Sequence, residues 1–417
     1  MEIKRDLYLD MLVKRKNNGL VKVVTGLRRV GKSYLIMRIF KNHLLNEGIS
    51  PDHIIEMAFD DIDNEEYLDP KVFSSFAKRK IVDGENYYFL LDEIQLMEGF
   101  EYVLNGLMRR ENVDIYVTGS NAKFLSQDII TEFRGRGDEV HLWPLSFSEF
   151  MSVYAGDKRD GWNDFILYGG LPVVVLMSDV AHKVKTLKSL FDETYILDIK
   201  KRHKIRNIGE MNELLDILSS NIGSLTNPQK LMNSFKSIKK SKITSATINR
   251  YIQYLSESFL IEFAKRYDVK GKRYIETPMK YYFSDLGLRN ARINFRQVEP
   301  THSMENAIYN ELRIRGFDVD VGTVPVVQKN LNGIPVHKNL EIDFVANKGS
   351  KRYYVQSSYI VPDEEKNEQE YRPFRKVDDS FKKILVTYDA PAPLYTQDGI
   401  LVMSIFDFFL RPNSLDL

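Results

Sequence analysis

The stretch TGLRRVGKSYLI, residues 25–36, constrains the fold of this 417-residue chain more than any other feature. It follows a short apolar run, and residues 26–33 match the pattern G-x-x-x-x-G-K-[ST]. In that pattern the glycines let backbone N–H groups curl around a phosphate, and the helix that follows directs its positive dipole end at the same anion. We therefore expect a strand, a phosphate-binding loop and a helix in succession. The expected nucleotide contacts are Gly26, Arg29, Val30, Gly31, Lys32, Ser33 and Tyr34.

Two acidic residues, Asp92 and Glu93, end the apolar run YYFLLDE, which is typical of a buried parallel strand. Ligands bind at the carboxyl ends of the strands in open α/β sheets, so these acids would lie beside the loop. We expect Lys32 to reach the β and γ phosphates of the nucleotide. Ser33 and Asp92 would bind Mg²⁺, and Glu93 would orient or activate the attacking water. The alternative is that the two acids only cap a helix.

Further polar and basic residues follow in the same third of the chain. Asn121 comes after the apolar run IYVT and would contact the γ-phosphate or the attacking water. Arg134 and Arg136, in FRGRG, would stabilise charge on the transferring phosphoryl group, from within the chain or from a neighbouring subunit. The alternatives are a polar helix cap for Asn121 and surface arginines near a helix C-terminus, where the helix dipole favours them.

The order of apolar runs predicts the domain organisation. Within residues 1–150, strand-like runs at 20–25, 54–59, 87–91, 115–118 and 140–142 alternate with amphipathic helical stretches, which indicates an α/β domain with a parallel sheet. Residues 151–225 are mostly helical, and we expect them to form a helical lid. We assign residues 226–295 to a second, basic domain, and residues 296–417 to a C-terminal α/β domain.

Composition excludes several classes of protein. The chain has no cysteine, which excludes disulfides, thiolate metal sites and cysteine nucleophiles and fits a reducing compartment. The formal net charge of +1 commits the whole chain to neither nucleic acid nor membrane. The N-terminus lacks the apolar core of a signal peptide, and no stretch approaches 18 apolar residues without charge. We therefore expect a soluble, cytoplasmic protein with no membrane partner.

Positive charge is concentrated in residues 228–280, which hold nine Lys and three Arg against four Asp and Glu. The pattern reads as helix, turn, helix and then a two-stranded hairpin, and it resembles a winged helix-turn-helix. We expect Ser245 to cap the second helix. A basic helix and wing can bind the phosphates of duplex DNA, but such folds also serve as protein-contact modules. The expected DNA contacts are Thr247, Asn249 and Arg250 on the helix and Lys270, Lys272 and Arg273 at the wing tip.

The order of these motifs resembles that of the AAA-type P-loop ATPases. In particular, TGLRRVGKS, LLDEIQ, VTGSN, FRGRG, WPLSFSEF, YGGLP and EIDFVA resemble the bacterial and archaeal ATPases whose C-terminal part is labelled domain of unknown function 4143. The resemblance covers nearly the whole chain, and its N-terminal motifs are the more specific ones. It implies a P-loop NTPase domain with a helical lid, followed by a winged helix, and it implies binding of ATP with Mg²⁺ and hydrolysis.

The C-terminal region resembles the PD-(D/E)xK fold of restriction nucleases in its layout. Glu305 lies in a helical stretch and Asp343 in a strand, but the E-x-K position reads Gln356-Ser357-Ser358. A metal-dependent nuclease needs carboxylates that bind Mg²⁺ and usually a lysine, so this site is degenerate. A lysine from elsewhere in the chain, such as Lys382 or Lys383, would restore part of the missing charge. The alternative, which we prefer, is a nuclease-like fold kept for binding or packing.

These motifs predict an ATPase that couples its nucleotide state to a C-terminal half that binds DNA or a protein partner. Two other functions remain open at this point. One is a nucleotide-gated scaffold or switch without a DNA role, and the other is an ATP-dependent nuclease. If a neighbouring subunit supplies the arginine that stabilises the transferring phosphoryl group, the protein is a homo-oligomer.

Overall fold

A computed structural model describes residues 3–119, 136–205, 208–239, 243–296, 298–329, 334–359, 364–390 and 392–417. The chain divides into two compact units. Unit one comprises Met1–Pro144 and Glu257–Phe259, and unit two comprises Leu145–Ser256 and Leu260–Leu417.

Unit one contains a five-stranded sheet in the order β2-β3-β4-β1-β5. Every neighbouring pair of strands is parallel, so the parallel sheet that the sequence predicts is confirmed. The strands are β1 (Val21–Thr25), β2 (Ile54–Ala58), β3 (Tyr87–Asp92), β4 (Val113–Thr118) and β5 (Gly137–His141). In a parallel sheet all carboxyl ends lie at one edge, so the residues after β1, β3 and β4 are brought together.

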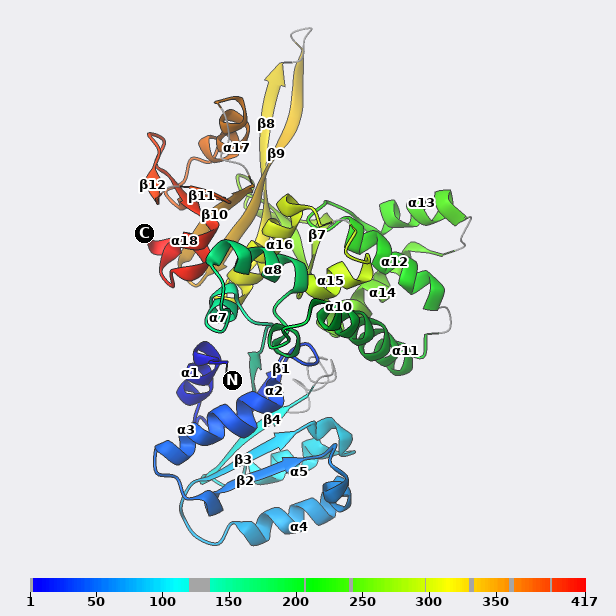
Figure 1. Ribbon diagram of the computed structural model, residues 1–417, viewed down its shortest axis with the longest axis vertical. Coiled ribbons are helices and arrows are strands. Elements are labelled where there is room, and N and C mark those ends of the chain that lie inside the picture. The colour runs from blue at the N-terminus through cyan, green and yellow to red at the C-terminus, as the bar shows by residue number, and fades with distance from the viewer. Residues whose placement is uncertain are drawn as a thin grey trace. The chain divides into compact units, whose positions relative to one another are not determined.

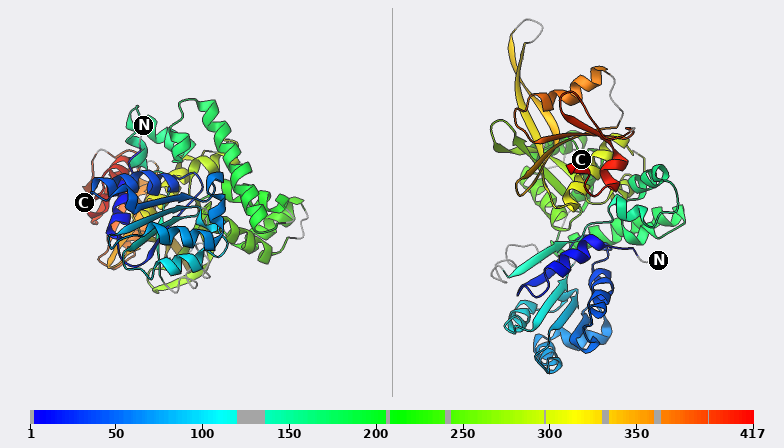
Figure 2. Two further views of the ribbon diagram at one scale, coloured as in Figure 1. Left: turned by 90° about the horizontal axis from the view of Figure 1, so that it is seen from below. Right: turned by 90° about the vertical axis from the view of Figure 1, so that its left-hand side faces the viewer.

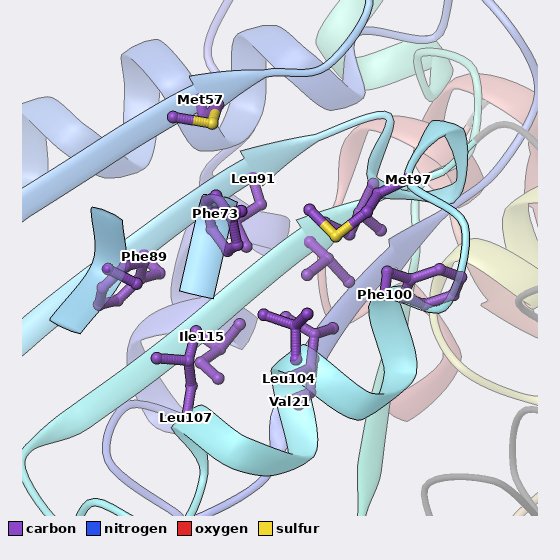
Figure 3. Packing of buried hydrophobic residues seen from close by; sticks show 14 of the residues in the cluster. Val21, Met57, Phe73, Phe89, Leu91, Met97, Phe100, Leu104, Leu107 and Ile115 are labelled. Atoms are coloured by element: carbon purple, nitrogen blue, oxygen red, sulfur yellow. The ribbon is translucent and has the colours of Figure 1, made fainter. Parts of the chain in front are cut away.

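Helices cover both faces of this sheet (Figure 1). They are α1 (Asp6–Lys14), α2 (Lys32–Tyr34), the π-helical η1 (Leu35–Phe40), α3 (Lys41–Asn46), α4 (Pro70–Lys80) and α5 (Phe100–Leu107), with 3₁₀ turns η2 (Pro51–His53), η3 (Ile62–Leu68) and η4 (Ile94–Leu96). Alternate residues of the strands face opposite sides. On one side Phe89 and Ile115 pack against Phe73 of α4 and Leu104 of α5 (Figure 3). On the other side the ring of Tyr116 lies 4.4 Å from that of Phe40.

Unit two begins with helices that fall in the part of the sequence expected to form a lid. They are α7 (Phe147–Met151), α8 (Lys158–Tyr168), α9 (Pro172–Val175), α10 (Val180–Ser189), η6 (Leu190–Ile196), α11 (Leu197–Arg202) and α12 (Ile208–Ser220). The motif WPLSFSEF contains the start of α7, where the Ser146 side chain and the Glu149 side chain form a capping box. The ring of Phe147 then lies 5.9 Å from that of Phe409 near the C-terminus, so these helices share a core with the C-terminal region.

The rest of unit two contains an eight-stranded sheet in the order β12-β13-β11-β10-β9-β8-β6-β7. Its strands are β6 (Ile261–Asp268), β7 (Arg273–Phe283), β8 (Asp318–Lys329), β9 (Pro335–Lys348), β10 (Lys351–Ser358), β11 (Lys382–Thr387), β12 (Leu394–Tyr395) and β13 (Ile400–Ser404). The helices are α13 (Pro228–Lys239), α14 (Ser245–Glu257), α15 (Leu286–Arg292), α16 (Pro300–Ile314), α17 (Glu364–Arg375) and α18 (Ile405–Leu410), with the 3₁₀ turn η7 (Ser414–Asp416). The β8–β9 hairpin extends beyond the other strands of this sheet (Figures 1 and 2).

Two features of the basic segment differ from the expected winged helix. Thr244 rather than Ser245 caps α14, because the Oγ1 of Thr244 accepts a hydrogen bond from the N–H of Thr247 at 3.2 Å. The β6–β7 hairpin is also not a free wing, since Arg266–Asp268 pair with Val321–Thr323 of β8. The sheet therefore crosses residue 295, where we expected a domain boundary, and that boundary stays a prediction.

The YGGLP motif is held by a buried carboxylate. Asp285 Oδ2 accepts a hydrogen bond from the N–H of Gly170 at 2.8 Å, and its Oδ1 accepts one from Leu288 at 2.9 Å. A Cβ at Gly287 would lie 2.1 Å from the carbonyl oxygen of Tyr168, so the two segments meet backbone to backbone. Burial raises the pKa of Asp285 to about 6, although the hydrogen bonds from the backbone oppose this rise. The motif therefore joins α8 to α15 and has a structural role in unit two.

Candidate nucleotide site

The loop between β1 and α2 has a backbone that its glycines allow. Gly26 has a φ of +133°, and a Cβ there would lie 2.1 Å from the carbonyl oxygen of Leu142. Gly31, immediately before α2, has a φ of +96°, and Arg29 has a φ of +66°. Glycine adopts the angles found at positions 26 and 31 without a steric cost, so the two glycines of the pattern follow from the shape of the loop. The loop is thus shaped for the approach of a ligand to its backbone.

Lys32 is folded back onto this loop. Its Nζ donates hydrogen bonds to the carbonyl oxygens of Gly26 at 3.0 Å and Leu27 at 2.9 Å, and only 6% of the residue is exposed. Burial lowers the pKa of Lys32 to about 8, although the nearby Glu93 and Asp92 oppose this change. A desolvated ammonium held this way gains strongly from an anionic ligand, because the ligand restores the charge balance that burial disfavours.

The acids after β3 are held by a residue that the sequence analysis did not single out. Thr118 ends β4, and its hydroxyl is fully buried. The Thr118 Oγ1 donates a hydrogen bond to Oδ1 of Asp92 and accepts one from the N–H of Glu93 at 3.1 Å. Glu93 has a φ of +50°, an unusual backbone for a non-glycine residue. Thr118 therefore fixes the carboxylate of Asp92 and the backbone of Glu93. The sequence signal for this role was a threonine at the carboxyl end of the neighbouring predicted strand.

Arg5 is a second residue that supports the nucleotide site and that no local motif reveals. It precedes α1, and its side chain is buried. The Nη2 of Arg5 donates to the carbonyl oxygen of Trp143 at 2.6 Å, and its Nη1 lies 3.5 Å from the carbonyl oxygen of Val30. Arg5 thus ties the phosphate loop to the segment after β5, across almost the whole sequence of unit one.

The other predicted residues fall into three groups. Ser33 and Tyr34, in α2, are exposed beside the loop. Arg136 lies elsewhere, because its carbonyl oxygen accepts a hydrogen bond from the N–H of Val21, at the amino end of β1. The loop follows the carboxyl end of β1, about 13 Å away along the strand. The structure therefore does not bring Arg136 to the loop of its own chain. Asn121 and Arg134 lie outside the described residues.

The donors at this edge suit a magnesium ion. Mg²⁺ prefers oxygen ligands, and Ser33 and Asp92 supply a hydroxyl and a carboxylate. Asp92 is 6% exposed and is held by Thr118, so its carboxylate is already oriented. Within the described residues, no group of three or more His, Cys, Asp and Glu side chains could hold a metal ion by itself. A cation at this site would therefore need oxygen ligands from a nucleotide as well.

In unit two the predicted DNA contacts occupy two places. On α14, Asn249 and Arg250 are exposed, whereas Thr247 is half-buried and contacts the capping Thr244. Lys270, Lys272 and Arg273 lie at the exposed turn between β6 and β7. The structure thus leaves these basic side chains at the surface.

The residues that resemble a nuclease site are only partly brought together. Asp343 Oδ2 accepts the N–H of Ser357 at 2.9 Å, and the Asp343 N–H donates to Oε1 of Gln356 at 3.2 Å. Ser358 lies at the end of β10, where it pairs with Thr387 of β11.

The expectation that Lys382 or Lys383 restores charge there is wrong. Their ammonium groups contact backbone carbonyl oxygens instead, that of Leu415 for Lys382 and that of Val377 for Lys383. The lysine that reaches Glu305 and Asp343 is Lys280 of β7.

Two family models match successive parts of the chain. A family model described as an AAA domain matches residues 18–151, and a model described as a domain of unknown function (DUF8612) matches residues 159–299. The first model ends with α7, and the second contains the later helices through α15 together with the β6–β7 hairpin. The resemblance to domain of unknown function 4143 and to nucleases stays a prediction.

Two relatives extend over most of the chain. An uncharacterized protein of Haemophilus influenzae is 33% identical over 98% of this chain and 99% of its own length. An uncharacterized protein of Methanocaldococcus jannaschii is 28% identical over 90% of this chain and 81% of its own length.

Among solved structures, the Orc1 protein of Aeropyrum pernix in complex with DNA is 12% identical, with coverage of 70% of this chain and 93% of that chain and a TM-score of 0.29. Such a low score supports no inference about this protein. In the described part of the chain no helix is long and apolar enough to cross a membrane.

Proposed function

The chain belongs to the family of its Haemophilus influenzae relative, a family whose N-terminal part in this chain is an AAA domain, and on that premise we propose that it is a Mg²⁺-dependent ATPase. The observation that carries this proposal is the set of side chains at one edge of the unit-one sheet. Lys32 begins α2, directly after the loop that follows β1, and Asp92, Glu93 and Thr118 lie at the carboxyl ends of the neighbouring strands β3 and β4.

Each of these residues has a defined role in the proposed reaction. The loop backbone and the ammonium of Lys32 bind the β and γ phosphates, and Lys32 exchanges its two carbonyl contacts for phosphate oxygens. Ser33 and Asp92 hold the magnesium ion, which when bound neutralises charge on the phosphate oxygens. Glu93 orients the attacking water and accepts its proton.

An arginine from elsewhere completes the site in this proposal. Arg136 lies beside the amino end of β1, whereas the nucleotide loop follows the carboxyl end of that strand. In this proposal Arg136 therefore acts on the nucleotide of a neighbouring subunit. Such an arginine raises turnover about 10³–10⁵-fold in other nucleotide hydrolases. The proposal therefore includes a homo-oligomer, whose turnover per chain rises with protein concentration.

The test is steady-state hydrolysis of ATP by the full chain, together with binding of ATP. We expect Lys32→Ala to abolish binding, and Glu93→Gln to keep binding and to lower kcat about 10²–10⁴-fold. The matched control is Lys78→Ala, which removes an exposed lysine of α4 and should change neither quantity. Hydrolysis by Lys32→Ala at the rate of the original chain would refute the proposed site.

We further propose that the nucleotide state is coupled to binding of duplex DNA by unit two. Support comes from the exposed basic side chains at the β6–β7 turn and on α14. Binding that depends on phosphate contacts falls with salt, by about 0.9 in log–log slope for each contact. Replacing Lys272 and Arg273 with alanine should reduce that slope by about 2, whereas Lys185→Ala on α10 should leave it unchanged. If duplex DNA neither binds nor stimulates hydrolysis, unit two is instead a scaffold for a protein partner.

A further inference from the structure

One ammonium group lies among three carboxylates in unit two. The Nζ of Lys280 is 2.8 Å from Oε1 of Glu305, 2.8 Å from Oε1 of Glu341 and 3.5 Å from Oδ1 of Asp343. Lys280 is 3% exposed, and Glu305 and Asp343 are 7% and 8% exposed. Only Glu341 reaches the solvent appreciably, with 37% of its side chain exposed. A lysine is almost never buried unless it is paired, and here it is paired three times.

The four residues come from three elements that the sequence does not place together. Lys280 is on β7, at the end of the sheet, Glu305 is on α16, and Glu341 and Asp343 are on β9. Strands β6 and β8 lie between β7 and β9 in the sheet order. The charge cluster therefore joins the β6–β7 hairpin to the helix and strand that carry the nuclease-like acids.

Other polar groups also lie beside the carboxylates of the cluster. The hydroxyl of Tyr282 donates to Oε1 of Glu305 at 2.7 Å, and Nδ1 of His302 lies 3.9 Å from Oε2 of Glu305. Asp343 uses Oδ1 for Lys280 and Oδ2 for the N–H of Ser357. The amide oxygen of Gln356, at the first position of the E-x-K pattern, accepts the N–H of Asp343.

A divalent cation would need the same carboxylate oxygens. Mg²⁺ binds oxygen at about 2.0–2.1 Å and Ca²⁺ at about 2.3–2.6 Å, so a cation shared by these carboxylates would occupy the position of the ammonium. The two cannot be present together. The residues thus do not fit the metal that a nuclease-like site implies, and no hydrolytic step follows from them.

We propose that Lys280 is the resident cation of this site and permanently takes the place of a divalent metal. The acids that resemble a nuclease set then serve to anchor the β6–β7 hairpin, and the native protein binds neither Mg²⁺ nor Mn²⁺ there. With Lys280 in place, these acids form no metal-binding group. Removing the ammonium leaves three carboxylates without a counter-charge in a mostly buried position, so we expect them to rearrange around a metal ion that replaces it.

The test compares the original full chain with Lys280→Met, a variant that keeps an unbranched side chain, one atom shorter, and removes its charge. The probe is Tb³⁺, whose emission is excited through tyrosine, and Tyr282 lies beside Glu305. We expect Lys280→Met to bind one more Tb³⁺ ion than the original chain does, and we expect Mn²⁺ to displace that ion. The affinity of the variant for Tb³⁺ should be at least tenfold above that of the original chain. Mn²⁺ at about 100 times its Kd should raise the Tm of this variant by about 5 °C or more and leave the original chain unchanged.

Two controls separate this proposal from general loss of structure. Lys280→Arg keeps a cation and should gain no metal, and Lys280→Met combined with Asp343→Asn should lose the gained site. Equal metal binding with and without Lys280 would overturn the proposal, as would a folded Lys280→Met that gains none. If Lys280→Met does not fold, crystals of the original chain soaked in Mn²⁺ decide. An anomalous peak among Glu305, Glu341 and Asp343 refutes the proposal, and its absence beside a peak at a loaded nucleotide site supports it.

Discussion

Replacing Thr118 with valine tests the part of the nucleotide site that the tertiary structure revealed. The two side chains have nearly the same shape, so the change removes one hydroxyl from a fully buried position. That hydroxyl donates to the carboxylate of Asp92 and accepts the N–H of Glu93. A hydrogen bond to a charged group contributes about 1.5–3 kcal/mol, and the loss of a partner for a buried group costs about 1–3 kcal/mol.

If about 1.4–2.7 kcal/mol of this loss appears in the activation barrier, kcat for ATP falls about 10–100-fold. The assay is steady-state hydrolysis with separate kcat and KM, beside ATP affinity by calorimetry. We expect affinity to change less than kcat, because Lys32 and the loop remain. The control Thr118→Ser keeps the hydroxyl and loses one methyl group, about 0.8 kcal/mol of burial, and should retain most of the turnover. Full activity in the valine variant would refute the role assigned to Thr118.

Three further changes test other contacts. Gly26→Ala should abolish ATP binding and destabilise unit one, because its Cβ would lie 2.1 Å from the carbonyl oxygen of Leu142; a variant with unchanged calorimetric affinity and Tm would contradict this geometry. Because the pKa of Lys32 is about 8, ATP affinity should fall above pH 8, by up to about tenfold for each pH unit. The affinity of Lys32→Arg for ATP should stay constant between pH 8 and 9.5. The same decline in both proteins would exclude Lys32 as its cause. The folded state raises the pKa of Asp285 to about 6, so it holds a proton that the unfolded chain releases near pH 4. Unit two should therefore lose stability as pH rises from about 4 to 6, by about 3 kcal/mol, with little change above pH 6. Asp285→Asn should lack this dependence, and parallel unfolding curves for the two proteins across that range would contradict the assignment.

The sequence could predict the phosphate loop because its chemistry is local. The loop is eight residues long, its shape depends on glycines at Gly26 and Gly31, and its position after an apolar run defines the strand and helix around it. The acids after β3 were predictable for the same reason, since a buried strand that ends in two carboxylates points to one edge of a parallel sheet.

Predictions that depended on pairing between distant parts of the chain were less accurate. The hairpin after α14 has the sequence of a wing, but β6 pairs with β8, and no local pattern shows which strand will lie beside another. Two lysines near the C-terminus were expected to complete the nuclease-like site, but Lys280 fills that place from β7. The placement of Arg136 likewise depended on the register of β5 against β1.

By itself, therefore, the amino-acid sequence predicted the nucleotide loop, the strand and helix that flank it and the two acids after a buried strand, because neighbouring residues carry all of that information. Only the tertiary structure decided that Thr118 holds the carboxylate of Asp92 and the backbone of Glu93, that Arg5 contacts the loop, and that Lys280 lies among three carboxylates. Each of these contacts joins residues far apart in the chain, and burial makes the contact obligatory, since a polar group removed from water must find its partner wherever the fold places one.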